Sequence, residues 1–192
     1  MKLSRDWITW SRLAWGVLVA GLLVLQVRQV ARLPSMTPAK PMVGEVAPAL
    51  GFSSADGSAI EPSEFRGRVV IVSFWAAWCA PCRKELPELA SLVDDWNSRA
   101  DETRRVSFVM VNQGEPPESL SMFIDDPRLK SARFTFDPDG AIANRWKVAA
   151  LPTTLLIGRD GRVLDAQQGY DQYLRFRFEN VLRKELGSAS AP

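Results

Sequence analysis

The feature that most constrains the fold is an apolar run that leads directly into two cysteines. Residues Val69–Trp75 are mostly β-branched and aromatic, which predicts a buried strand. From Pro81 onward the apolar residues follow a helical spacing, so the chain should pass from strand to helix around Cys79. A helix start offers unpaired N–H groups and the positive end of the helix dipole, and both favour an anion. The position therefore predicts a lowered thiol pKa and a reactive thiolate at Cys79.

Cys82 follows three residues later, on the same helical face and one turn deeper. A nucleophile and its resolving partner would thus be neighbours. Pro81 between them suits an early helix position, because its φ is preset and it has no N–H to leave unpaired. The chain has only two cysteines, and a disulfide that closes so short a loop removes little entropy from the unfolded chain. A chemical role is therefore favoured over half of a zinc site or an incidental surface disulfide.

Composition narrows the function classes further. A chain of 192 residues with 46% apolar content can form one domain of ordinary size plus an appendage. Its 24 basic and 22 acidic residues nearly balance, so we expect no nucleic-acid face. The chain has no histidine, which excludes Cys-His nucleophile pairs and Cys/His zinc sites, and no metal site is predicted.

Two motifs carry a family resemblance. The segment Phe74–Glu85, FWAAWCAPCRKE, resembles the redox site of a thioredoxin fold, and more narrowly that of the membrane-anchored TlpA/ResA/CcmG-type thiol-disulfide reductases. The segment Leu151–Thr154, LPTT, matches the place where this fold holds a cis-proline facing the cysteine pair. The resemblance covers roughly residues 46–186. It implies an α/β thioredoxin fold in which helices flank a central mixed sheet, with an N-terminal hairpin and a central strand-helix insertion.

The resemblance also implies the chemistry. The Cys79 thiolate would attack a disulfide in a partner protein, and Cys82 would resolve the mixed disulfide, without any cofactor. In thioredoxin, a buried carboxylate that can accept the Cys82 proton lies at the position held here by Ser73, so this chain departs from that pattern. Glu85 matches the conspicuous acid of the ResA-like group and is predicted to tune or accept the proton. The alternative for Glu85 is a solvated helix charge paired with a neighbouring base.

Other residues are predicted to recognise the substrate. Leu151 would offer backbone groups to an extended substrate segment, with Pro152 in the cis form and Thr153 beside it. The alternative for Pro152 is an ordinary trans proline in a turn. Trp78, next to the nucleophile, is a candidate for an exposed substrate contact, whereas Trp75 is more consistent with the core.

The N-terminal part predicts a membrane attachment. Residues 1–12 form a basic leader, and 13–27 an apolar run whose leading tryptophans fit an interfacial belt. This run is interpreted as an uncleaved transmembrane anchor, with a cleaved signal peptide as the alternative. A Pro-rich tether is expected over 28–45, the thioredoxin-like domain over 46–187 and a disordered tail over 188–192.

Basic residues flank both sides of the apolar run, so the charge bias that sets orientation is weak. The resemblance supplies the orientation: a single-pass protein of the inner membrane, with its domain in the periplasm or another extracytoplasmic space. It would take electrons from a membrane thiol carrier and reduce protein disulfides, cytochrome c apoproteins being the family's best-known substrates. The alternatives are a thiol oxidant of the same fold and a module that binds Cu(I) or only docks a partner. Peroxidase activity fits the paired cysteines poorly.

The rest of the chain predicts alternating elements. A Pro-kinked helix is expected to run to about Asn97. The other expected elements are a hairpin over 50–60, strands over 106–111, 134–136, 153–157 and 163–166, helices after Pro117 and over 140–147 and 170–186, and a hairpin turn over 159–162.

Overall fold

The computed structural model describes residues 15–26, 41–49, 52–53, 59–60 and 62–187. The chain divides into two units, Met1–Thr37 and Pro38–Pro192. In the first unit, residues 15–26 form a helix. Within the described ranges, no helix combines the length and the apolarity needed to cross a membrane. The predicted leader, the ends of the predicted anchor, most of the tether and the tail lie outside the described residues: 1–12, 13–14, 27, 28–40 and 188–192.

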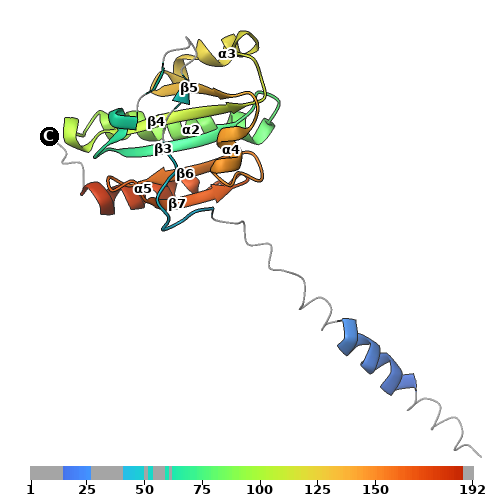
Figure 1. The fold of residues 1–192 in the computed structure, drawn as a ribbon. Helices are drawn as coiled ribbons and strands as arrows, with labels where there is room; N and C mark the ends of the chain where they lie inside the picture. The colour runs from blue at the N-terminus through green and yellow to red at the C-terminus, as the bar shows by residue number, and fades with distance from the viewer. Residues whose placement is uncertain (1–14, 27–40, 50–51, 54–58, 61, 188–192) are drawn as a thin grey trace, which may run out of the picture. The chain divides into compact units, whose positions relative to one another are not determined.

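The second unit is built on a five-stranded mixed sheet in the order β5-β4-β3-β6-β7 (Figure 1). Strands β3, β4 and β5 are parallel, whereas β6 runs antiparallel to β3 and β7 antiparallel to β6. The mixed sheet predicted from the sequence is confirmed. Its strands are β3 Val69–Trp75, β4 Val106–Gln113, β5 Ala132–Asp137, β6 Thr153–Ile157 and β7 Val163–Gln168.

The central strand β3 is buried along its whole length. Val69 and Ile71 join one hydrophobic cluster, and Val70 and Val72 join another on the opposite face of the sheet. A strand covered on both faces needs apolar residues on both, which is why this run is nearly continuous rather than alternating.

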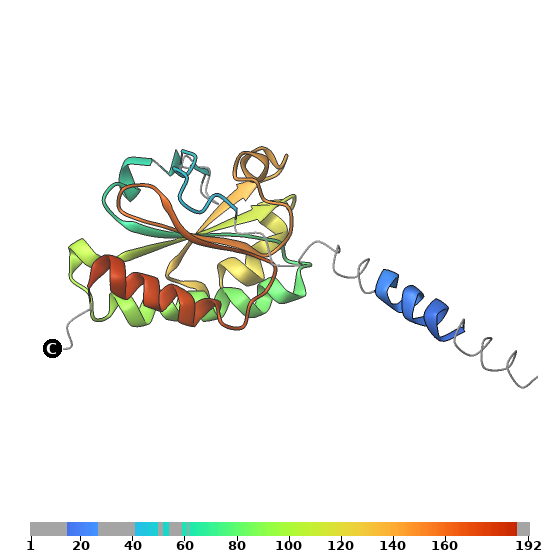
Figure 2. The ribbon, with the colours of Figure 1, turned by 90° about the horizontal axis from the view of Figure 1, so that it is seen from below.

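Helices cover both faces of the sheet. The redox helix α2 (Ala80–Asn97) and the closing helix α5 (Leu174–Leu186) lie on one face, and the short helix α4 (Ala141–Arg145) lies on the other (Figure 2). The hairpin of β1 (Phe52–Ser53) and β2 (Ala59–Ile60) precedes β3, as predicted. Trp96 and Trp146 are buried on opposite faces.

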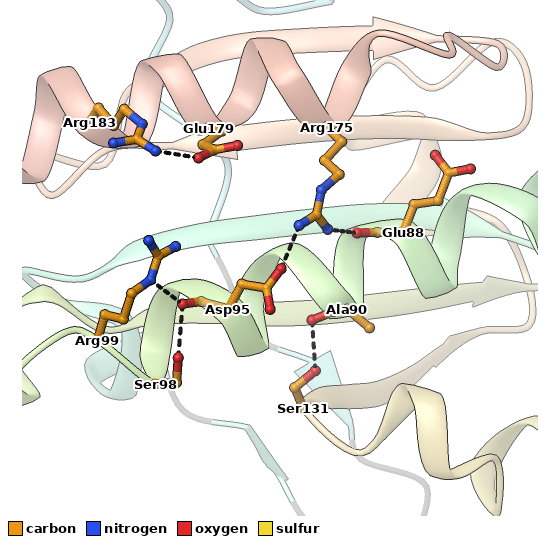
Figure 3. Close-up of polar contacts among 9 residues, drawn as sticks. All are labelled: Glu88, Ala90, Asp95, Ser98, Arg99, Ser131, Arg175, Glu179 and Arg183. Atoms are coloured by element: carbon orange, nitrogen blue, oxygen red, sulfur yellow. Dashed lines mark hydrogen bonds and ion pairs between the residues drawn. The ribbon is translucent and has the colours of Figure 1, made fainter. Parts of the chain in front are cut away.

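Polar contacts hold α2 from both sides (Figure 3). From α5, the Arg175 guanidinium donates to the Glu88 carbonyl at 2.9 Å and pairs with Asp95 at 2.6 Å. From the segment before β5, the Ser131 hydroxyl donates to the Ala90 carbonyl at 3.5 Å. The helix that carries the cysteines is thereby fixed to its neighbours.

The predicted strand-helix insertion is correct only in its helix, because its expected strand, 106–111, belongs to β4 of the main sheet. The name insertion is kept here for the segment between β4 and β5. This segment consists of two 3-10 turns, η3 (Pro117–Leu120) and η4 (Pro127–Leu129), around the short helix α3 (Ser121–Ile124). The Phe123 ring packs on Trp75 with centroids 5.0 Å apart, which ties the insertion to the strand that leads into the site. Two further 3-10 turns are η1 (Pro62–Phe65) and η2 (Glu102–Arg104).

Several boundaries differ from the prediction: β5 and β7 are longer than the expected strands 134–136 and 163–166, and α4 is shorter than the expected helix 140–147. The closing helix begins at Leu174 rather than Tyr170, because the Asp171 carboxylate accepts the Tyr173 N–H in a preceding turn. The strand predicted to end at Val111 continues to Gln113 as β4, because β5 pairs with it to that point. Residues 41–45, predicted to belong to the tether, pack on the domain: Met42 is buried, and the Gly44 N–H donates to the Val163 carbonyl at 2.9 Å.

Candidate active site

The two cysteines form a disulfide at the start of α2. The sulfurs are 1.99 Å apart, and Cys79 is the N-cap of the helix rather than part of its first turn. The Cys79 sulfur accepts the Cys82 N–H at 3.3 Å, and the Cys79 carbonyl accepts the Arg83 N–H at 3.2 Å. Cys79 is 4% exposed, and Cys82 is fully buried. The outer sulfur therefore belongs to Cys79. It lies at the helix end, where an N–H can stabilise the negative charge that this sulfur carries as a thiolate once the disulfide is reduced.

A carboxylate fixes the loop between β3 and the disulfide. Glu115 accepts the Ala77 N–H at 2.7 Å and the Asn112 side-chain amide at 2.8 Å, both through Oε2. Asn112 lies near the end of β4 and is buried. Sequence reasoning missed Glu115, and the only signal was an acidic residue directly after Gly114 at a strand end.

The predicted cis-proline is present. The Leu151–Pro152 peptide bond is cis, and Phe74 of β3 pairs with Thr153 of β6. Pro152 thus lies at the end of the sheet from which β3 leads to Cys79. The Thr153 side chain is fully buried and donates its hydroxyl hydrogen to the carbonyl oxygen of Ala150 at 2.6 Å, so it faces the loop rather than solvent.

Glu85 lies in the interior, one helical turn beyond Cys82, and is only 2% exposed. The alternative interpretation, a solvated helix charge, is therefore wrong. The Thr154 hydroxyl donates to Glu85 Oε1 at 2.7 Å, and Ser73 Oγ lies 2.9 Å from the same Thr154 oxygen. Since Thr154 gives its one hydrogen to the carboxylate, Ser73 donates to Thr154. Glu85 Oε2 has no hydrogen-bond partner within the described part of the chain.

This environment brings the pKa of Glu85 close to neutral pH. Burial raises the pKa of its carboxyl to about 7, and the negative charges of Glu88 and Asp171 add to that rise. The hydrogen bond from Thr154 and the positive charge of Arg177 lower the same pKa, but by less than burial raises it. A carboxyl group with this pKa can exchange a proton with a thiol at ordinary pH.

The rim of the site is aromatic and basic. Trp78 is 72% exposed, as expected for a substrate contact, and Trp75 is buried in the core as predicted. The Lys84 ammonium lies 4.7 Å from the centroid of the Tyr170 ring, and a hydrogen bond with Tyr170 raises the pKa of that ammonium.

Leu151 is half-buried and packs against the hydrophobic cluster that contains Cys79 and Cys82. The sequence-predicted residues therefore gather at one end of the sheet, and Thr154 is an addition that the motif contained without an assigned role.

Comparison with known proteins agrees with this geometry. Residues 43–166 match the AhpC/TSA family. The chain is 32% identical over 130 residues to the thiol-disulfide oxidoreductase ResA of Bacillus subtilis (strain 168), covering 66% of this chain and 67% of that protein. With ResA of Bacillus thuringiensis subsp. konkukian it shares 28% identity over 142 residues, 74% of this chain and 78% of the other.

Among solved structures, a candidate thiol:disulfide interchange protein DsbE from Chlorobium tepidum superposes with a TM-score of 0.63 at 25% identity. The match covers 79% of this chain and 100% of that one. The chain is thus similar in sequence to proteins named as thiol-disulfide oxidoreductases, and in fold to one named as a thiol:disulfide interchange protein. The chain belongs to the AhpC/TSA family and is a thiol-disulfide oxidoreductase of the TlpA/ResA/CcmG-like group of the thioredoxin superfamily.

Proposed function

We propose that this oxidoreductase reduces disulfides in partner proteins. The observation that carries the proposal is the outer sulfur of Cys79 at the helix start, where it accepts the Cys82 N–H. In the reduced enzyme the Cys79 thiolate attacks a substrate disulfide, forms a mixed disulfide and releases one substrate thiolate. Cys82 then attacks the Cys79 sulfur, which forms the internal disulfide and releases the second substrate thiolate. Two electrons pass from the cysteine pair to the substrate.

Cys82 must lose its proton before it can attack. We propose Glu85 as the acceptor, because the helical spacing places it one turn beyond Cys82 and because burial raises the pKa of its carboxyl to about 7. Protons on the two released substrate thiols then balance those lost from the enzyme thiols.

The Glu85→Gln variant tests that role. The glutamine side chain would keep the shape but cannot accept a proton, so the resolving step should slow by about a hundredfold near pH 8. The rate of this step should also no longer increase as the pH rises through 7, as it does in the wild type. The measurement is the rate at which a preformed mixed disulfide resolves, as a function of pH. Glu118→Gln, an exposed charge change on the insertion, is the matched control. A Glu85→Gln profile equal to that of the wild type would contradict the assignment.

The Cys82→Ser variant tests the reaction itself. It keeps the attacking thiol but cannot resolve the intermediate, so a disulfide-bonded model protein such as insulin should accumulate as a mixed disulfide with about one protein per enzyme. Mass spectrometry under non-reducing conditions detects this species, and a reductant should release it. Cys79→Ser should trap nothing. If Cys79→Ser traps the protein and Cys82→Ser does not, the two roles are reversed.

The Cys82→Ser variant, expressed in the source cell, captures the natural partner for identification.

We further propose that the enzyme is tethered to the inner membrane through residues 13–27, with its domain outside the cytoplasm. The apolar run behind a basic leader supports the anchor. A membrane thiol carrier would return electrons to the oxidised pair, and cytochrome c apoproteins awaiting haem are the proposed substrates. A reduction potential below that of the substrate disulfides is expected. A potential above it would instead favour a thiol oxidant of the same fold.

A further inference from the structure

A groove of about 210 Å³ lies between α2 and the insertion that follows β4. Its lining combines an apolar surface with three charged side chains. The apolar residues are Leu86, Pro87, Met122, Phe123 and Leu129, and the charged ones are Arg83, Asp126 and Arg128.

The groove continues the face of α2 that begins at the nucleophile. Arg83 follows Cys79 by four residues, and Leu86 and Pro87 follow Arg83 by three and four, so all four share one stripe of the helix. Four residues of helix span about 6 Å, which two residues of an extended chain also cover. A peptide linked to the Cys79 sulfur would therefore reach the groove with a side chain two or three positions from its own cysteine.

The charges of the groove do not cancel. Arg128 pairs with Asp126 at 2.7 Å, so these two neutralise each other. The Arg83 side chain is exposed and forms no hydrogen bond or ion pair with any residue in the described ranges. One uncompensated positive charge thus stands at the end of the groove that is nearest to the disulfide, where it complements a carboxylate.

The apolar part suits a side chain of adaptable shape. Met122 is 74% exposed at the groove, and a methionine can change rotamer to fit different aliphatic groups. Pro87 lies inside α2 and presents only its apolar ring to the groove, because it has no N–H.

We propose that this groove binds the segment of a substrate protein that flanks its reactive cysteine, with an apolar side chain against Met122 and Phe123 and an acidic side chain on Arg83. The inference rests on the proposed reductase function and specifies its substrate class: disulfides whose cysteine has an apolar and an acidic residue within three positions. A second copy of this chain is the competing occupant.

Three peptides test the proposal on the reduced full-length protein. Each carries one cysteine as a mixed disulfide with a chromophoric thiol, and their flanks hold Leu and Glu, Leu and Lys, or Gly and Glu. Wild-type protein should react with the Leu/Glu peptide about fivefold faster than with either other peptide. Arg83→Glu should reverse the order of the Glu and Lys peptides, and Met122→Asp should remove the preference for Leu over Gly. Because each result is a ratio within one variant, changes in thiol reactivity cancel.

Arg145→Glu is the matched control, since it makes the same charge change on α4, on the opposite face of the sheet, and should keep the wild-type ratios. Equal rates for the three peptides, or Arg83→Glu ratios equal to those of the wild type, would overturn the groove assignment. Sedimentation that shows a dimer which Met122→Asp dissociates would overturn it too, in favour of self-association. Reduction of neutral 2-hydroxyethyl disulfide by the wild type tests the reductase function separately. If the proposed reductase function is wrong, this reaction is absent; if only the groove assignment is wrong, the reaction persists.

Discussion

Replacing Cys79 by serine should lower the rate of disulfide exchange by about three orders of magnitude or more, the scale on which loss of a catalytic nucleophile acts. A serine hydroxyl at the helix start stays protonated at neutral pH, and the Cys82 N–H that stabilises charge on the Cys79 sulfur has no thiolate to act on. The remaining thiol, Cys82, is fully buried and out of reach of a protein disulfide. The measurement is stopped-flow reduction of insulin by the prereduced protein, with 2-hydroxyethyl disulfide as a second substrate.

The Cys82→Ser variant is the control for this prediction. That variant should keep a first-step rate within about tenfold of the wild type and then stop after one exchange, whereas Cys79→Ser should lack the first step as well. Thermal unfolding of both reduced variants checks that they are folded. Exchange by Cys79→Ser at a rate near that of the wild type would show that Cys82 is the attacking thiol, and the assignment of the outer sulfur would fail.

The elements that determine the fold were predictable because their signals are local. β3 is a continuous apolar run, and α2 begins where that run meets a proline and a helical spacing, so neither needs distant information. The start of α5 was not predictable to the residue, because the Asp171 carboxylate accepts the Tyr173 N–H in a turn that precedes the helix. The tether boundary failed for a similar reason: Gly44 is tied to Val163, a partner far along the sequence.

The residues of the site were likewise predictable where the signal is local, and not where it depends on how the sheet is assembled. The cysteine pair and the cis-proline loop each occupy a short motif, so resemblance located both. The contacts of Glu85 and Glu115 depend instead on sheet order and register, which bring together residues separated by 69 and 38 positions. Helical spacing placed Glu85 on the face of Cys82, but its burial follows only once β6 lies beside β3 and places Thr154 opposite Ser73. The strand position that holds a carboxylate in thioredoxin thus holds a hydroxyl here, and the hydroxyl leads through Thr154 to a carboxylate on the helix.

That buried carboxylate should leave a large signature in the pH dependence of stability. The pKa of Glu85 is about 7 in the folded protein against 4.5 for an ordinary glutamate, so the folded state binds an extra proton between these values. The stabilisation is fully present below pH 4.5 and is lost as the pH rises through 7, a change of about 3 kcal/mol in the free energy of unfolding. Glu85→Gln does not titrate, so the wild-type minus variant difference should fall by that amount across this range.

Urea denaturation of the oxidised protein and its Glu85→Gln variant at a series of pH values measures the difference, in which the titrations of all other groups cancel. Thr154→Val gives the matched test, since it keeps the carboxyl and removes the hydroxyl that donates to it at 2.7 Å. The pKa of Glu85 should then rise by about one further pH unit, and the loss of stability should move to higher pH accordingly. A difference between wild type and Glu85→Gln that stays constant from pH 4 to pH 8 would mean that the pKa of Glu85 is the same in the folded and unfolded states, which contradicts the rise expected from its burial beside Glu88 and Asp171.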